Sequence, residues 1–154
     1  MKSMNATPKD VERAMNLAQY AVLWSTSKAE LVFRLFEDEA KGLDIPVNRQ
    51  VLSMVPLPLA LVGLENKIKE RHGEALAKVF LFSVTVSMLP LAKTDAERSD
   101  AKAAAELMAV KMFGQRGTTA VLELLAQVPC PTEKFVSGFE GLKKLLSSVP
   151  LAQE

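Results

Sequence analysis

The residue best suited to acid–base chemistry is His72, the single histidine of this 154-residue chain. It follows Arg71, and Glu65, Glu70 and Glu74 lie close to it in the sequence. A general base needs an orienting carboxylate, and one of these glutamates could supply it. A histidine at the end of a helix, however, commonly satisfies free backbone carbonyls. A small enzyme with a polar site around His72 is therefore the last of three functional hypotheses, and we predict no catalytic residue.

The only cysteine, Cys130, lies between Pro129 and Pro131. A nucleophilic cysteine needs a base, a cation or a helix N-terminus that stabilises its thiolate, and a helix starting at Thr132 supplies this only weakly. One cysteine and one histidine also exclude an internal disulfide, a thiolate zinc site and any site with two imidazoles. We interpret Cys130 as structural and expect neither a metal nor a cofactor.

The densest acidic run is Glu37-Asp38-Glu39. Consecutive side chains on a helix point about 100° apart, so three in a row do not converge on one ion. We expect a solvated face, with a carboxylate metal site or a contact for a basic partner as the alternatives. The two glycines of Gly114-Gln115-Arg116-Gly117 follow a helical sequence and not a strand, which argues against a phosphate-binding loop.

The composition describes a folded domain without a charge bias. Apolar residues make up 49% of the chain and charged residues 24%, and the formal net charge is +1. This overall charge indicates no nucleic acid, anionic membrane or acidic substrate as a partner. The chain is long enough for one sizeable core and too short for two. We expect a single helical domain over 1–154, with 1–6 and 150–154 frayed.

Two apolar stretches, 50–64 and 79–92, come closest to membrane spans. Each has about 14 or 15 residues and contains proline, whereas a bilayer helix needs about 20 apolar residues. The N-terminal residues contain no apolar signal-peptide segment. We therefore expect buried helices, no membrane span and a cytoplasmic location.

Helix signals are spread along the chain. Thr7 and Pro8 start a first helix. The capping box Ser27-Lys28-Ala29-Glu30 starts a second helix, which ends at Gly42. The predicted core face of this second helix consists of Leu31, Val32, Leu35 and Phe36.

Proline, glycine and capping residues place the remaining helices. They are expected around 47–54, 58–71, 74–88, 94–113, 118–128 and 132–148, with a short loop at 115–117. The segment 79–88 also alternates apolar and polar residues like a strand, but it lacks a pairing partner. We predict an all-α fold, a single compact irregular bundle of about seven or eight helices. An α+β fold with a strand near 79–88 is the minor alternative.

The C-terminal helices 118–128 and 132–148 suggest a helix-turn-helix, and a DNA-binding regulator is the alternative function. Its second helix should begin with side chains that read base edges, such as arginine or asparagine. It offers Glu133 and Lys134, followed by Phe135 and Val136. These side chains are poorly suited to recognising base edges, so nucleic acid is the less favoured partner.

The preferred function follows from a surplus of apolar residues. The segments 54–59 and 80–82 are apolar on all sides of a helix, so they are central in the core or continue into an interface. Seven methionines add adaptable apolar surface. We predict a non-enzymatic protein-binding helical module, either self-associating or an adaptor, inhibitor or chaperone of another protein. The predicted contact residues are Trp24, Leu57, Leu59, Phe80 and Phe82.

Overall fold

The computed structural model describes residues 7–88, 94–125, 140 and 144. In these residues the chain forms six helices and no strand: α1 (Pro8–Ser27), α2 (Glu30–Gly42), α3 (Arg49–Met54), α4 (Leu57–His72), α5 (Glu74–Met88) and α6 (Asp95–Leu125). The predicted all-α fold is confirmed. The alternative strand near 79–88 is wrong, because this segment lies within α5. The chain ends that we expect to be frayed, 1–6 and 150–154, lie outside the described residues.

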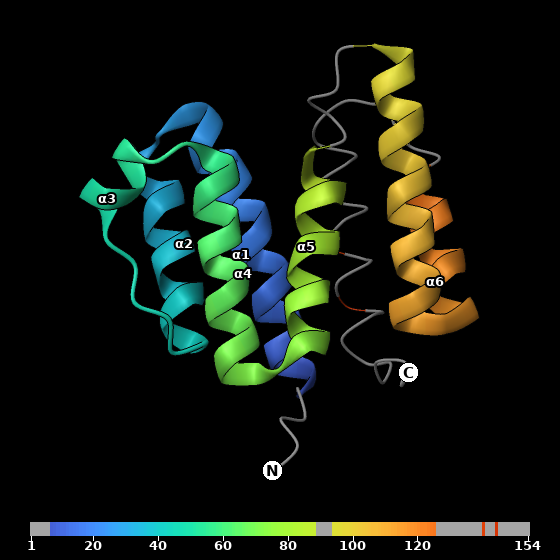
Figure 1. Cartoon of the computed structure of the whole chain (residues 1–154), viewed down its shortest axis with the longest axis horizontal. Helices are drawn as coiled ribbons and strands as arrows, with labels where there is room; N and C mark the ends of the chain where they lie inside the picture. Colours follow the sequence, from blue (N-terminus) through green and yellow to red (C-terminus); the bar gives the residue numbers. More distant parts are fainter. Residues whose placement is uncertain (1–6, 89–93, 126–139, 141–143, 145–154) are drawn as a thin grey trace.

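The helix α5 lies at the centre of the described part of the chain (Figure 1). It packs against α1, α4 and α6, and α2 packs against α1 on the side away from α6. The short helix α3 lies at the outer edge, beside α2. No helix in the described ranges is both long enough and apolar enough to cross a membrane.

The strand-like sequence of α5 reflects its central position. Its apolar side chains are buried on several sides because the helix has three helical neighbours. Between them stand the small hydroxyl residues Ser83, Thr85 and Ser87. Thr85 Oγ1 donates to the Leu81 carbonyl of the same helix at 3.0 Å, a bond that helical threonines commonly form. Alternation of polar and apolar residues therefore does not mark a sheet face in this segment.

The N-terminus of α1 is capped as its sequence predicts. Asp10 N–H donates to Thr7 Oγ1 at 3.1 Å, and Thr7 N–H donates to the Asp10 carboxylate at 3.2 Å. The capping box predicted at Ser27 is wrong, because α1 continues through that residue. Ser27 Oγ donates backwards to the Leu23 carbonyl at 3.1 Å.

The end of α1 is set by a left-handed residue, Lys28, with φ 55°. Its N–H donates to the Trp24 carbonyl at 2.7 Å, which closes the last turn. The helix α2 then begins after Ala29 with no side-chain cap. Only two residues therefore separate α1 from α2.

The core face of α2 differs from the predicted one. Leu31 and Leu35 are exposed, and Phe33 is buried together with Phe36. The ring of Phe33 lies 5.1 Å from the ring of Trp24 at the end of α1. Packing on this indole turns the two phenylalanines inward, and the leucines consequently face solvent.

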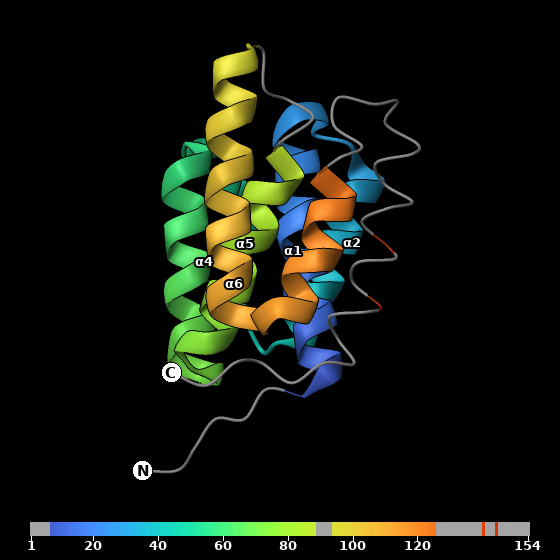
Figure 2. The same ribbon diagram turned by 90° about the vertical axis from the view of Figure 1, so that its right-hand side faces the viewer.

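The N-terminus of α6 is closed by a capping box: Glu97 N–H donates to Thr94 Oγ1 at 3.1 Å, and Thr94 N–H donates to the Glu97 carboxylate at 3.4 Å. The loop predicted at 115–117 is wrong, because α6 is helical through those residues. Figure 2 shows the ribbon of α6 turning back on itself in its orange part. The helix predicted at 118–128 is the end of α6 as far as Leu125, and the one predicted at 132–148 falls almost wholly outside the described residues.

Candidate functional site

His72, the last residue of α4, has a structural contact. Its ring Nε2 lies 2.8 Å from the Leu43 carbonyl oxygen. A carbonyl oxygen only accepts, so Nε2 is the donor and carries a hydrogen. The neighbouring Arg71 donates to the Asp44 carboxylate at 2.7 Å. Both side chains therefore fix the turn after α2 to the end of α4.

The acidic residues of α2 have different surroundings: some contact α1 and others face solvent. The Glu39 carboxylate accepts from Arg13 Nη1 and from Asn16 Nδ2 of α1, each at 3.3 Å. Asp38 is exposed. No group of three or more potential metal ligands occurs among the described residues. Cys130 lies outside them, so its predicted structural role remains a prediction.

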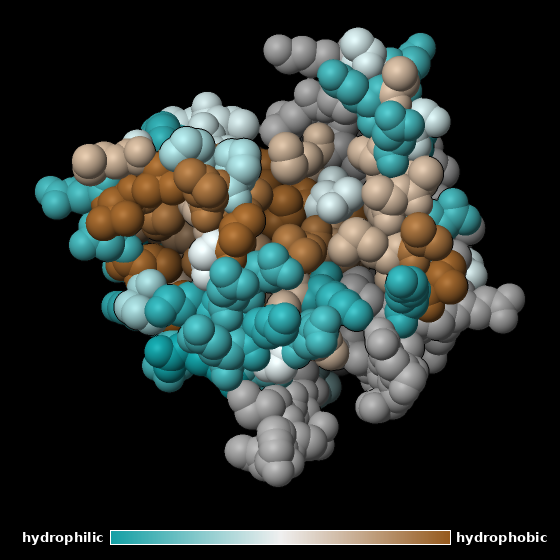
Figure 3. Space-filling model, in the orientation of Figure 1, coloured by the Kyte–Doolittle hydropathy of each residue, from teal (hydrophilic) through white to brown (hydrophobic). Residues whose placement is uncertain are grey.

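Large apolar side chains are exposed on α3 and on the first half of α4. They belong to Val51, Met54, Leu59 and Val62, with exposed fractions of 55%, 83%, 63% and 51%. We call these four residues the α3–α4 patch. Within each helix the two members are three residues apart, which places them on one face. Figure 3 shows brown, hydrophobic atoms gathered over α3 and the adjoining part of α4.

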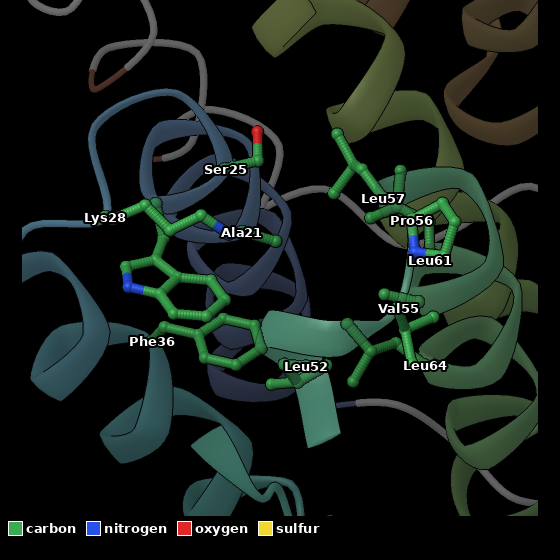
Figure 4. Close-up of a pocket in the computed structure, with 12 residues that line it drawn as sticks. Ala21, Ser25, Lys28, Phe36, Leu52, Val55, Pro56, Leu57, Leu61 and Leu64 are labelled. Atoms are coloured by element: carbon green, nitrogen blue, oxygen red, sulfur yellow. The ribbon is translucent and has the colours of Figure 1, made fainter. Parts of the chain in front are cut away.

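A cavity of about 220 Å³ lies between α4 and the helices α1 and α2. One wall includes Trp24 of α1 and Phe36 of α2, and the other includes Leu57, Leu61 and Leu64 of α4. In Figure 4, Phe36 and the α4 leucines lie on opposite sides of the space between them. Leu52 and Val55, each next in sequence to a patch residue, also line it. On α4, Leu57, Leu61 and Leu64 lie on one face of the helix, and Leu59 and Val62 lie on the opposite face, because successive residues are turned by about 100°. The cavity therefore lies on a different side of α4 from the patch, and we call the cavity and the side chains around it the apolar region.

The α1–α2 side of this region carries positive charge. Lys28 Nζ lies 4.6 Å from the centre of the Trp24 ring, and Arg49 Cζ lies 5.3 Å from the centre of the Phe33 ring. Aromatic faces attract cations in this geometry, because the ring quadrupole is negative above the plane. Both rings belong to one aromatic cluster.

A single carboxylate, Glu30, serves two of the nearby cations. It pairs with Arg49 through a side-chain hydrogen bond and with Arg34 at 3.7 Å. The hydrogen bond from Arg49 is the main reason that the pKa of Glu30 is lowered. The segments 21–29 and 46–64, which build most of the region, contain no aspartate or glutamate.

The structure divides the predicted contact residues into two groups. Trp24 is buried and Leu57 is partly buried, and both line the cavity, while Leu59 belongs to the α3–α4 patch. Phe80 and Phe82 of α5 are completely buried in the core. A partner at this surface can therefore reach the first three residues and not the last two.

Sequence reasoning missed three members of the patch: Val51, Met54 and Val62. The signal that could have found them is the spacing of Pro56 and Pro58. These prolines prevent one long helix through the apolar segment. The resulting α3 has only 6 residues and buries none of them. An apolar helix of this length leaves most of its side chains in solvent.

Comparison with known proteins gives no relative. No protein-family model matches the chain, and no curated protein or solved structure matches it. The functional assignment consequently depends on the geometry of the α3–α4 patch and of the cavity.

Proposed function

We propose that the protein is a protein-binding helical module that receives an apolar helix of another protein. The partner helix contacts exposed apolar side chains of α3 and places one large side chain in the cavity. The observation that carries this proposal is a cavity lined mainly by apolar side chains, with the exposed residues Lys28 and Pro56 at its edge. Protein interfaces commonly have this construction, in which a few large side chains fill pockets within a surrounding apolar contact.

The cavity volume supports a side-chain anchor. An apolar cavity of about 150 Å³ accepts benzene, so about 220 Å³ is enough for a leucine or phenylalanine side chain. Pockets for free small ligands commonly measure about 300–1,000 Å³. The cavity is smaller than that range, which favours one side chain of a larger partner over a separate small molecule.

The arrangement of the patch supports a helical partner. Residues on one face of an amphipathic helix recur three and four positions apart, and they fit a groove between two elements. Here α3 and α4 each carry such a pair, with Met54 and Leu59 as the most exposed members. The flexible methionine side chain adapts to the shape of its neighbour.

A second copy of the same chain is the less suitable partner. In a symmetric dimer the same surface meets itself. Both copies would then present Lys28 and Arg49 to a surface whose segments 21–29 and 46–64 contain no aspartate or glutamate, so this contact offers little charge complementarity. The DNA-binding alternative depends on helix 132–148, and no observation in the described residues favours it.

The single tryptophan, Trp24, makes the proposal directly testable because it lines the cavity. Tryptophan-free helical peptides with leucine or phenylalanine spaced three and four residues apart serve as probes. We expect a saturable change in Trp24 emission. Ala60→Phe, which fills the cavity from α4, should weaken peptide binding at least about tenfold, since an anchor side chain is commonly worth about 2 kcal/mol or more.

The matched control is Ala104→Phe, because Ala104 is exposed on α6 and far from the cavity in sequence. A second variant, Met54→Ser with Leu59→Ser, replaces the two most exposed residues of the patch without altering a buried residue. Circular dichroism of each variant checks that the helices are retained. No peptide binding to the unaltered protein, or equal binding to all folded variants, would contradict the proposal. Self-association measured by sedimentation would contradict the choice of partner.

A further inference from the structure

We infer that the partner helix is acidic beside its apolar face, an inference that rests on the proposed function. Two exposed cations, Lys28 and Arg49, lie over the Trp24 and Phe33 rings, and a third, Arg34, shares the Glu30 carboxylate with Arg49. We call Lys28, Arg34 and Arg49 the cationic edge. A partner helix that places carboxylates beside these cations would neutralise the positive charge that Glu30 alone does not balance.

The cationic edge is tied to the cavity by direct contacts. Lys28 lies over the Trp24 ring, and Trp24 lines the cavity. Arg49 lies over the Phe33 ring, which is 5.1 Å from the Trp24 ring. Arg49 is also three residues before Leu52, which lines the cavity, so both lie on one face of α3. A helix anchored in the cavity therefore passes these cations.

Lys28 is the cation most available to a partner. It is exposed, and in the part of the chain that the structure describes it forms no ion pair with a carboxylate. Its backbone is fixed by the left-handed φ of 55° and by the 2.7 Å hydrogen bond to the Trp24 carbonyl. Its ammonium group has three donors, so contact with the indole face leaves them free to bond a carboxylate.

Arg49 and Arg34 are less available, because both contact Glu30. One carboxylate between two guanidinium groups nevertheless leaves an excess of positive charge. Charges at the rim of an interface act mainly on association rate, orientation and partner choice. We therefore assign the apolar contacts to affinity and the cationic edge to selection among apolar helices.

The test uses three tryptophan-free helical peptides with one common apolar face. Their flanking positions carry glutamate, glutamine or lysine, and Trp24 emission reports binding. At low salt we expect the glutamate peptide to bind about tenfold more tightly than the lysine peptide, as two or three partly exposed ion pairs allow. High salt should reduce this ratio, because screening weakens exposed charge pairs.

Variants assign the preference to the cationic edge. Lys28→Gln with Arg49→Gln should reduce the ratio to about twofold or less, as exposed ion pairs of this kind are lost. The matched control is Lys9→Gln with Lys111→Gln, which removes the same two positive charges at exposed positions of α1 and α6 outside the cationic edge. It should leave the ratio unchanged.

The outcomes separate the two proposals. Equal affinity for all three peptides, with the Ala60→Phe effect retained, overturns the acidic partner and leaves the protein-binding function intact. An unchanged preference in the Lys28→Gln and Arg49→Gln variant also overturns it. No binding of any peptide to the unaltered protein overturns the proposed function itself. Displacement of the glutamate peptide by a DNA duplex at equal concentration overturns the choice of a protein as the acidic partner.

Discussion

The guanidinium group of Arg13 on α1 occupies the space that a β-carbon at Gly42 on α2 would need. From this position Arg13 reaches the Glu39 carboxylate at 3.3 Å, and Asn16 adds a second bond to the same carboxylate. Gly42 is the last residue of α2 and does not have a positive φ. Its missing side chain therefore provides room for a contact between α1 and α2.

Gly42→Ala should consequently have different effects in two backgrounds. In the unaltered protein the added methyl group displaces Arg13 from Glu39, and the loss of about 0.5–1 kcal/mol for a partly exposed ion pair offsets the gain in helix propensity. In the Arg13→Ala background the space is empty, and only the gain of up to about 1 kcal/mol from helix propensity is left. Urea unfolding of the four proteins measures both effects. Equal changes in the two backgrounds would contradict the proposed contact.

Ser83→Ala should stabilise the protein, in contrast to most core substitutions. Ser83 is fully buried on α5, and its hydroxyl has no hydrogen-bond partner in the described structure. Removing an unsatisfied hydroxyl recovers about 1 kcal/mol or more of desolvation free energy. Alanine also has the higher helix propensity. Thr85→Ala is the comparison, because the Thr85 hydroxyl is satisfied by the Leu81 carbonyl, and it should not stabilise the protein. A loss of thermal stability in the Ser83 variant would refute this reasoning.

Tyr20, the only tyrosine, should ionise at higher pH than a free tyrosine. Burial is the main cause of its raised pKa, and the charge of Glu39 adds to it. The phenolate is thus disfavoured in the folded state. The associated stabilisation is complete below about pH 10, the ordinary value, and is lost as the pH rises through the raised pKa. Absorbance titration at the phenolate band should give a midpoint above 10.0. Glu39→Gln should move this midpoint downward. A midpoint at the ordinary tyrosine value in the unaltered protein would contradict the burial of Tyr20 near Glu39.

Glu30 should titrate below an ordinary glutamate because Arg49 hydrogen-bonds its carboxylate. Its pKa is lowered in the folded state, so the pairing stabilises the fold above about pH 4.5 and is lost as the pH falls through the lowered pKa. Carbon-detected NMR of the side-chain carboxylate measures this value. Arg49→Gln should raise the pKa toward its ordinary value, whereas Lys9→Gln should leave it unchanged. Identical titrations in all three proteins would show that Arg49 does not hold Glu30.

Much of the fold could be predicted because its signals are local. The capping boxes at Thr7 and Thr94 each join residues three apart in the sequence, and both form. The Ser27 box has the same residue types and does not form, since its serine is still inside α1. Whether a capping sequence starts a helix thus depends on where the preceding helix ends, and here Lys28 decides that point.

The candidate site was harder to predict because its residues come from several different helices. Trp24, Leu57 and Leu59 could be chosen from apolar segments alone. Burial of Phe80, by contrast, depends on α5 having three helical neighbours. The cationic edge joins residues from α1, α2 and α3, and the contact between Lys28 and Trp24 requires a left-handed turn that no local pattern specified.

The short helix α3 gives the cavity a movable wall. It has no buried residue and packs extensively on no other described helix, yet it carries Leu52 and is followed directly by Val55. Small local openings need little free energy where few apolar contacts are broken. We therefore expect backbone amides of α3 to exchange hydrogen faster than those of α1 and α5. The cavity can thus widen for larger anchor side chains while the core around α5 keeps its packing.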